Sequence, residues 1–317
     1  MIGSRHPLGN LPARGQARRG TAARAACGVL LLATALLAGC ADVFFATVGG
    51  FGDTPGVVEQ HNLEFDPEHR LALDVYSPAG VVDAPVVVFF YGGSWEGGKR
   101  RWYKYVGDAL AHNGVVAVIP DYRKYPDVRF PAFMHDAASA VAWTRDHAHE
   151  FGGDRRRLFV MGHSAGGQIA ALLAADGRYL ATVGLNPRDL SGMIGLAGAY
   201  AFLPFVDNEA HIFGNDAHGR YDSQPINFID GDEPPMLLLQ GQDDDEVPPH
   251  NAEVMAERAQ AMDGTAVLKI YPGVGHSSIL LSFAHSKTTQ VPALHDVLAF
   301  IANPPVAPAA PLPAANP

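Results

Sequence analysis

One serine of this chain stands in a sequence that favours nucleophilic chemistry. Residues 162–167 read Gly-His-Ser-Ala-Gly-Gly, which fits the pattern Gly-x-Ser-x-Gly around Ser164. An apolar run precedes it and a helix-like segment follows, an order typical of a nucleophile elbow. Such a turn holds a hydroxyl exposed beside a base, and Gly162 and Gly166 would let its backbone pass close to neighbouring segments. We therefore expect Ser164 to be a nucleophile, and the alternative is a helix-capping serine in a glycine-rich turn.

A serine nucleophile needs a base, and His276 is the histidine best placed for that role. Residues 265–271 alternate enough to form a late strand, and residues 272–277 read Pro-Gly-Val-Gly-His-Ser. From such a loop Nε2 of His276 would reach Oγ of Ser164. The chain has 14 histidines, so position and not residue type selects this one. His163 occupies the variable place of the serine motif, and we expect its side chain to point away from the reacting centre.

The carboxylate that orients such a base is expected after another buried strand. Residues 235–240 are mostly apolar, and residues 241–248 read Gly-Gln-Asp-Asp-Asp-Glu-Val-Pro. A carboxylate just past the carboxyl end of a strand lies at the edge where open α/β sheets place their sites. Three consecutive aspartates, Asp243, Asp244 and Asp245, leave the choice open on these grounds alone, and a solvated acidic loop is the alternative.

A glycine-rich loop could stabilise the negative oxygen that forms when a serine attacks a carbonyl. Residues 86–90 read Val-Val-Val-Phe-Phe, a strand pattern, and residues 91–95 read Tyr-Gly-Gly-Ser-Trp. Gly92 and Gly93 would let backbone approach a substrate, and the N–H of Ala165 follows the nucleophile. One fixed donor at such a place is worth about 2.7–4 kcal/mol of transition-state stabilisation. A plain turn is the alternative for this loop.

Alternating strand and helix patterns predict the scaffold. Two antiparallel edge strands are expected over residues 57–65 and 71–76, followed by a helix over 102–112, a strand over 115–119, a helix over 133–149 and a strand over 193–196. This alternation predicts a mostly parallel sheet with helices on both faces. Arg123 is expected to pair with a carboxylate, and Asp136 to stabilise the fold and not to catalyse. Residues 199–234 mix aromatic residues and turns, which predicts a small cap insertion over the pocket or, alternatively, simple core filling.

Together these motifs resemble α/β-hydrolases of the hormone-sensitive-lipase and carboxylesterase type. More narrowly, they are similar to the branch that holds isoprenylcysteine methylesterases, feruloyl-esterase-like proteins and kynurenine formamidases. The resemblance covers residues 57–302, and its spacing Gly-x-x-Asp-x-x-Val-Pro selects Asp244 as the acid. It also implies Gly92, Gly93 and Ala165 as the oxyanion donors. Tyr91 departs from the pattern, because the family usually has a histidine there whose side chain supports the loop.

The resemblance implies an α/β-hydrolase fold and a serine esterase. Ser164, His276 and Asp244 would cleave carboxylic esters of small to medium size through an acyl-enzyme, with no metal and no organic cofactor. An amide hydrolase, either an arylformamidase or a small peptidase, is the alternative because the same triad serves both reactions. A binding protein on a hydrolase scaffold is a third interpretation, although such proteins usually lose the serine or the histidine.

The two ends of the chain have compositions unlike the rest. Residues 1–39 hold five arginines and no carboxylate, and the apolar run over 27–38 is shorter than the ~20 residues of a spanning helix. Residues 37–40 read Leu-Ala-Gly-Cys, which resembles a bacterial lipobox and implies cleavage before Cys40 and a lipid on its thiol. An ordinary signal peptide or an uncleaved anchor is the alternative. Residues 40–56 are then a tether, and residues 303–317, rich in Pro and Ala, a disordered tail.

The net charge limits the kinds of molecule that this chain can bind, and the positions of its cysteines limit where a disulfide can form. The formal net charge is −10, and removal of residues 1–39 would make it more negative. Such a chain should repel nucleic acid and anionic headgroups, so the lipid would be its membrane attachment and the cell envelope its location. Both cysteines, Cys27 and Cys40, precede the predicted domain, which therefore contains no disulfide.

Overall fold

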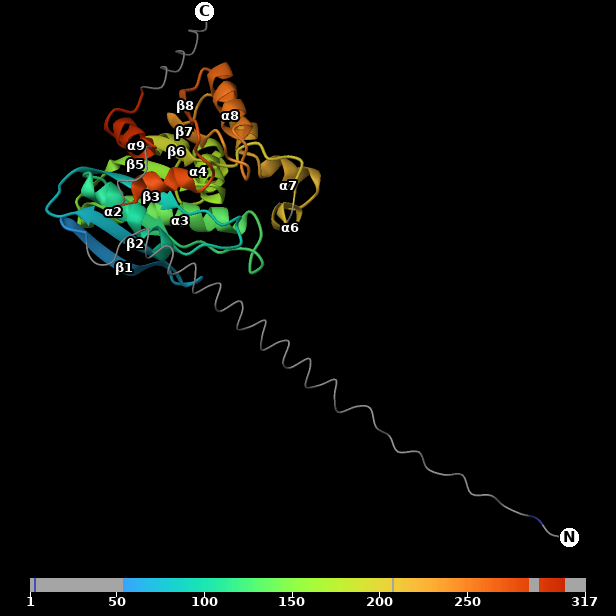
Figure 1. Ribbon diagram of the computed structural model, residues 1–317. Coiled ribbons are helices and arrows are strands. Elements are labelled where there is room, and N and C mark those ends of the chain that lie inside the picture. The colour runs from blue at the N-terminus through green and yellow to red at the C-terminus, as the bar shows by residue number, and fades with distance from the viewer. Residues whose placement is uncertain (1–2, 4–53, 207, 285–290, 306–317) are drawn as a thin grey trace, which may run out of the picture. The chain divides into compact units, whose positions relative to one another are not determined.

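An eight-stranded sheet forms the centre of the domain that the structure describes (Figure 1). The protein is described by a computed structural model over residues 3, 54–206, 208–284 and 291–305. The strand order is β1-β2-β4-β3-β5-β6-β7-β8, and β2 is antiparallel to both of its neighbours while all other pairs are parallel. The strands are β1(Val57–Asp66), β2(Leu71–Pro78), β3(Ala84–Phe90), β4(Val116–Pro120), β5(Gly153–His163), β6(Gly192–Leu196), β7(Met236–Gly241) and β8(Ala266–Tyr271).

The inner strands are apolar along their length because helices cover both faces of the sheet. Every side chain of β4, β6 and β7 is buried. Five consecutive residues of β3, Val86 to Phe90, have no exposed surface at all. Parallel strands covered on both sides read as continuous hydrophobic runs and not as alternating ones. These continuous apolar runs allow the inner strands to be predicted from the sequence.

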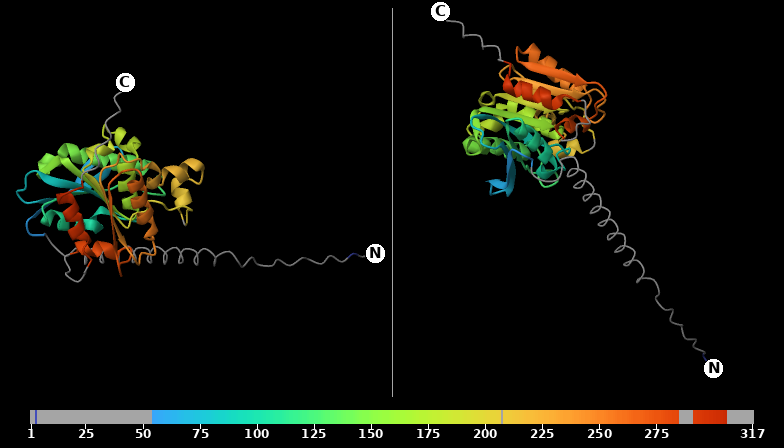
Figure 2. Two further views of the ribbon diagram at one scale, coloured as in Figure 1. Left: turned by 90° about the horizontal axis from the view of Figure 1, so that it is seen from above. Right: turned by 60° about the vertical axis from the view of Figure 1, so that its left-hand side comes forward.

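Helices pack on both faces, as the alternation predicts. The helix α3 contacts α4, while α2 and α9 both contact the short helical segment Ser278–Phe283 on the other face (Figure 2). None of the described helices is long and apolar enough to cross a membrane. The helices are α2(Lys104–His112), α3(Ala132–His147), α4(Ala165–Ala175), α5(Gly177–Ala181), α6(Glu209–Phe213), α7(Ala217–Asp222), α8(His250–Ala261) and α9(Ala293–Ala302).

The predicted elements all form, with boundaries that move by a few residues. One detail of the expectation is wrong, because of the two strands predicted at an edge only β1 lies there, and β8 forms the opposite edge of the sheet. β2 lies between β1 and β4, since Leu73 to Tyr76 pair with β4. The register of β1 against β2 shifts between Gln60 and Leu63, where the edge strand is irregular.

The predictions for the ends of the chain fall mostly on residues that the structure does not describe. The signal peptide at 1–39, the lipid site Cys40, most of the tether at 40–56 and most of the tail at 303–317 lie outside the described ranges. They stay predictions.

Candidate active site

Five loops meet at one edge of the sheet because five of the parallel strands end there. Ser164 follows β5, Gly92 follows β3, Asp244 follows β7 and His276 follows β8. The segment predicted as a cap, residues 199–234, follows β6. Carboxyl ends of parallel strands share an edge, so the fold brings together residues that lie up to 184 positions apart.

Ser164 lies on the tight turn that the sequence predicts. Its backbone φ of 55° and ψ of −123° belong to a region that non-glycine residues rarely adopt. A methyl group on Gly162 would lie 2.0 Å from the carbonyl oxygen of Gly166, so the crossing of strand and helix has no room for one. The turn leaves Ser164 half-buried between two fully buried neighbours. This is the strained geometry of a nucleophile elbow.

Asp244 and His276 form a buried pair. Nδ1 of His276 lies 2.9 Å from Oδ2 of Asp244, and the two residues expose 7% and 4% of their surface. Asp243 and Asp245 on either side are exposed. The arrangement fixes Nδ1 as the ring nitrogen that faces the carboxylate, with Nε2 on the other side of the ring.

The carboxylate of Asp244 is held in its ionised form by hydrogen bonds. Burial by itself raises the pKa of Asp244, but donation from His276, from the backbone N–H of Val247 and from Gln240 outweighs it, so the pKa lies below its ordinary value. The N–H of Val247 donates to Oδ1 at 2.8 Å, and Nε2 of Gln240 donates to Oδ2 at 2.9 Å. Gln240 was not predicted, although one polar residue at the end of an apolar strand is the signal that could have found it.

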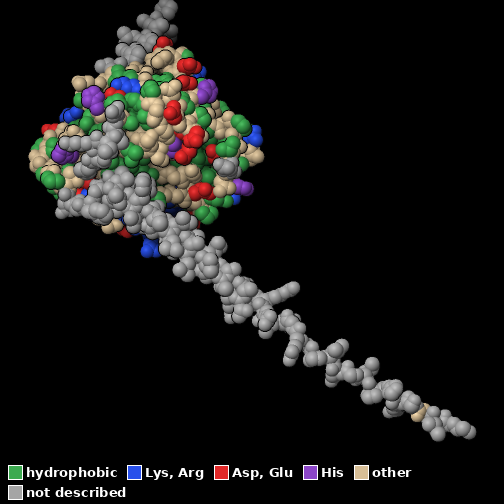
Figure 3. Space-filling view, in the orientation of Figure 1, with side chains coloured by type: hydrophobic (Ala, Val, Ile, Leu, Met, Phe, Trp, Pro, Cys, Tyr) green, Lys and Arg blue, Asp and Glu red, His purple; other side chains and the backbone are tan. Residues whose placement is uncertain are grey.

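Ser164 and His276 lie in adjacent loops. Among the described residues, no hydrogen bond joins Oγ of Ser164 to the ring of His276. Catalytic contacts of this kind are often long before substrate binds and tighten in the complex. Nε2 of His276 also faces an acidic side chain, since Oε2 of Glu246 lies 3.8 Å away with 67% of that side chain exposed. The surface in view in Figure 3 likewise carries several Asp and Glu side chains.

Tyr91 takes over the supporting role that a histidine has in the family. Its side chain is fully buried and stacks on Tyr122 with ring centroids 4.8 Å apart. Its hydroxyl donates to Oδ1 of Asp121 at 3.0 Å and accepts from Nζ of Lys124 at 2.9 Å. Tyr122 in turn donates to the carbonyl of Tyr91 at 2.8 Å. The start of the glycine loop is thus fixed by side chains as well as backbone.

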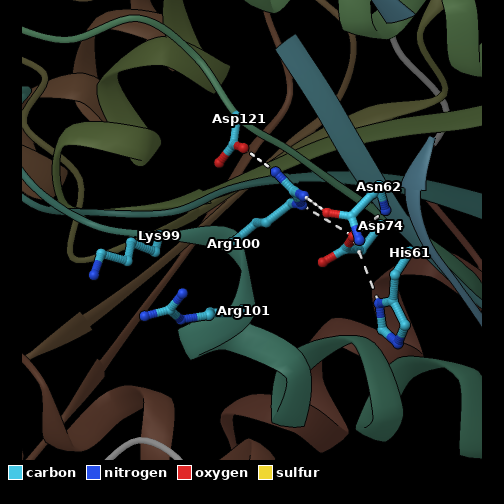
Figure 4. Close-up of a pocket in the computed structure, with 7 residues that line it drawn as sticks. All are labelled: His61, Asn62, Asp74, Lys99, Arg100, Arg101 and Asp121. Atoms are coloured by element: carbon cyan, nitrogen blue, oxygen red, sulfur yellow. Dashed lines mark hydrogen bonds and ion pairs between the residues drawn. The ribbon is translucent and has the colours of Figure 1, made fainter. Parts of the chain in front are cut away.

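A polar cavity of about 370 Å³ lies behind this support (Figure 4). Arg100 crosses it and binds Asp121, Asn62 and Asp74, the last with Nε 2.9 Å from Oδ1. Because Asp121 also accepts from Tyr91, the cavity belongs to the framework of the glycine loop. The remaining lining residues are His61, Lys99 and Arg101.

The predicted oxyanion donors differ in their surroundings. The backbone of Gly92 is hydrogen-bonded to the side chain of Tyr103. Gly93 is exposed, and Ala165 is the first residue of α4. Of the three predicted donors, Gly93 and Ala165 are therefore better placed than Gly92 to serve a substrate oxygen.

Gln168 ties the glycine loop to the segment predicted as a cap. Its Oε1 accepts from Nε1 of Trp95 at 3.1 Å, and its Nε2 donates to the carbonyl of Ser223 at 2.9 Å. Trp95 also stacks on Phe202 and meets the edge of Phe213, with centroids 5.5 and 4.8 Å apart. A second cavity of about 460 Å³ lies beside Phe213, between the start of α3, α5 and α7. Aromatic residues of the insertion thus pack over the loop, although their action as a cap stays a prediction.

One expectation for the site is wrong. His163 does not point away from the reacting centre, because Nε2 of its ring lies 3.1 Å from the carbonyl oxygen of His276. The two imidazole rings lie 4.7 Å apart. The variable place of the serine motif faces the loop over residues 272–277, which carries His276 and is called the base loop below, because that loop folds back over the end of β5.

Arg123 and Asp136 have the structural role that the sequence indicates. Nη2 of Arg123 lies 2.6 Å from Oδ1 of Asp136, and Nε also donates to this carboxylate. Asp66, His69 and Asp136 offer ligand atoms within 4.8 Å of one another, a spacing that could hold a metal ion. A cation there would have to displace Arg123, because the guanidinium already uses both oxygens of Asp136.

Comparisons with known proteins agree with this architecture. The model of the prolyl oligopeptidase family matches residues 134–304, and the model named BD-FAE matches residues 73–183. The probable isoprenylcysteine alpha-carbonyl methylesterase ICMEL1 of Arabidopsis thaliana is 26% identical over 70% of this chain and 52% of its own length. Esterase LipC of Mycobacterium tuberculosis is 32% identical over 65% of this chain and 56% of its own length. The chain therefore spans about half the length of these curated relatives.

Solved structures share the fold. A truncated form of a carbohydrate esterase from gut microbiota superposes with a TM-score of 0.67 at 19% identity, covering 80% of this chain and 98% of its own. The apo form of Thermogutta terrifontis esterase 2 superposes with a TM-score of 0.63 at 23% identity, covering 78% and 93%.

Proposed function

Because this chain belongs to the prolyl oligopeptidase family of the α/β-hydrolases, and to their hormone-sensitive-lipase and carboxylesterase type, we propose that it is a serine esterase for small to medium carboxylic esters. The observation that carries the proposal is the buried Asp244–His276 pair beside the strained turn at Ser164. An ionised carboxylate that orients an imidazole near a serine on a strained turn is the arrangement that activates serine.

The reaction follows from the roles of these side chains. Oγ of Ser164 attacks the ester carbonyl carbon while Nε2 of His276 takes its proton. The negative oxygen accepts from the backbone amides of Gly93 and Ala165. His276 then gives the proton to the leaving alcohol, and water releases the acyl group by the same steps in reverse. Asp244 stays ionised throughout and stabilises the imidazolium.

A labelling and turnover experiment tests this assignment. The wild-type protein is expected to react with a fluorophosphonate probe and to hydrolyse p-nitrophenyl acetate, and Ser164→Ala is expected to do neither. Asp244→Asn should lower kcat by about 10⁴-fold, as the wrong imidazole tautomer does in other triads. Asp243→Asn is the matched control, because this neighbouring carboxylate is exposed, and it should leave kcat unchanged. Full activity in Asp244→Asn would remove this residue from the triad.

Peptide or amide cleavage is the second candidate, and the match to the prolyl oligopeptidase family favours it. The same triad attacks amides, so geometry at Ser164 does not separate the two reactions. Turnover of p-nitrophenyl acetate compared with an Ala-Pro p-nitroanilide and with N-formylkynurenine distinguishes an esterase from a peptidase and an arylformamidase. Faster turnover of either amide would replace the ester assignment.

We also propose that the mature protein is anchored in the bacterial cell envelope by a lipid on Cys40. The support is the sequence Leu-Ala-Gly-Cys after a basic and then apolar segment. Cells grown with an alkyne fatty acid should label the wild-type protein but not Cys40→Ala, and the variant should leave the membrane fraction. Labelling that persists in Cys40→Ala would refute the anchor.

A further inference from the structure

His163 is buried between the base loop and the glycine loop. It exposes 5% of its surface, and its ring lies 4.7 Å from the ring of His276. Its Nε2 is 3.1 Å from the carbonyl oxygen of His276, the residue whose side chain must reach Ser164. The imidazole therefore holds the backbone of the base and not its side chain.

The partners of the ring fix its tautomer. A carbonyl oxygen only accepts hydrogen bonds, so Nε2 of His163 must carry the hydrogen and Nδ1 must be a bare acceptor. Nδ1 is buried and has no hydrogen-bond partner in the described structure. Burial, together with the positive charge that His276 can carry, lowers the pKa of His163 to about 3, so the ring stays neutral at physiological pH.

The other side of the ring faces the glycine loop. A methyl group on Gly92 would lie 2.9 Å from Nδ1 of His163 and 3.1 Å from Cβ of Ser164. The imidazole thus fills the space between the loop after β3 and the loop after β8. A change in this ring alters the distance between them.

We propose that His163 is a positioning residue, which sets the base loop against the nucleophile and the glycine loop through its bond to the His276 carbonyl. The inference rests on the proposed esterase function, and it assigns a role to the variable place of the serine motif. The imidazole acts through His276 and touches no substrate. Without the bond, the base loop can move, and misplacement of about 1 Å can cost on the order of 100-fold in rate.

Two substitutions at this position separate positioning from simple packing. His163→Phe keeps a ring of similar size and removes the donor, whereas the amide N–H of His163→Gln can occupy the place of Nε2–H. We expect His163→Phe to lower kcat for p-nitrophenyl acetate by about 30- to 100-fold, with KM within about twofold. His163→Gln should recover kcat to within about fivefold of wild type.

His147→Phe is the matched control, because Nδ1 of His147 also bonds a backbone carbonyl, that of Trp143 at 2.8 Å, on a helix outside the site. Its kcat should be unchanged. Full kcat in His163→Phe would overturn the proposal, as would equal loss in a folded His163→Gln. Loss of kcat in His147→Phe to the same extent would also overturn it.

A readout without turnover keeps the proposal separate from the proposed function. Long-range ¹H–¹⁵N spectra of the wild-type protein should show His163 as the neutral Nε2–H tautomer, and a Nδ1–H tautomer would refute the geometry. If wild type and Ser164→Ala turn over esters at the same rate, the esterase proposal fails. The spectra would then still show whether Nε2–H of His163 donates to the carbonyl of His276.

Discussion

Acid should destabilise this protein through His163, and the size of the effect follows from its burial. In the unfolded chain this imidazole binds a proton below its ordinary pKa of 6.5, whereas in the folded protein it does so only near pH 3. The unfolded state therefore holds more protons between these two values, and stability falls as pH falls. The contribution is fully present above about pH 6.5 and is lost progressively down to about pH 3.

The magnitude comes from the difference in proton affinity. One pKa unit corresponds to about 1.36 kcal/mol, so acidification from about pH 7.5 to about pH 5 removes about 2 kcal/mol through this residue. That is a large fraction of the roughly 5–15 kcal/mol that stabilises an ordinary domain.

Urea unfolding followed by tryptophan fluorescence at the two pH values measures it. Wild type and His163→Gln share every other titrating group, so the difference between their pH effects isolates this imidazole. We expect wild type to lose about 2 kcal/mol more than His163→Gln on acidification. The reasoning fails if both proteins lose the same free energy of unfolding.

Three further substitutions have defined outcomes. Tyr91→Phe removes the buried hydroxyl that donates to Asp121, so it should lower the stability by about 1–3 kcal/mol in thermal unfolding and should also lower kcat. An unchanged melting temperature would contradict the support that Tyr91 gives the glycine loop. Gly92→Ala places a methyl group 2.9 Å from a neighbouring imidazole nitrogen, so esterase turnover should fall at least about tenfold, and wild-type turnover would show that the loop has room. Glu246→Gln removes a charge whose carboxylate oxygen lies 3.8 Å from Nε2 of His276. It should lower kcat/KM about threefold for acetylcholine relative to its neutral isostere 3,3-dimethylbutyl acetate at low salt, and a ratio that is unchanged, or that does not fade at high salt, would refute a charge effect.

The sequence is sufficient to locate strands and site loops where residue type and local pattern act together. The apolar runs before Ser164 and Asp244 locate buried parallel strands, and loops after such strands share one edge. Asp244 needed the family spacing, because nothing local distinguishes it from the aspartates on either side. Its four hydrogen-bond donors then explain why it, and not a neighbour, is buried.

Contacts between residues that lie far apart in the sequence could not be predicted from it. His163 and His276 are 113 residues apart, and only the path of the base loop decides that one ring lies against the other. The same holds for Gln168, which joins Trp95 to Ser223 across three separate segments. The sequence shows that Tyr91 departs from the family pattern, but the acceptor of its hydroxyl, Asp121, follows a different strand.

The irregular outer strand β1 has a consequence for copies of this chain crowded together. A regular strand with an open side is a template on which a second molecule can add its own strand. On β1 the pairing is interrupted between Gln60 and Leu63, Asn62 has a left-handed φ of 59°, and its N–H donates to Asp74 instead of extending a ladder. Bulges of this kind twist an edge strand, so that a strand of a second molecule cannot pair with it regularly. Molecules packed at high density on a surface would therefore not join their sheets into fibres through this side.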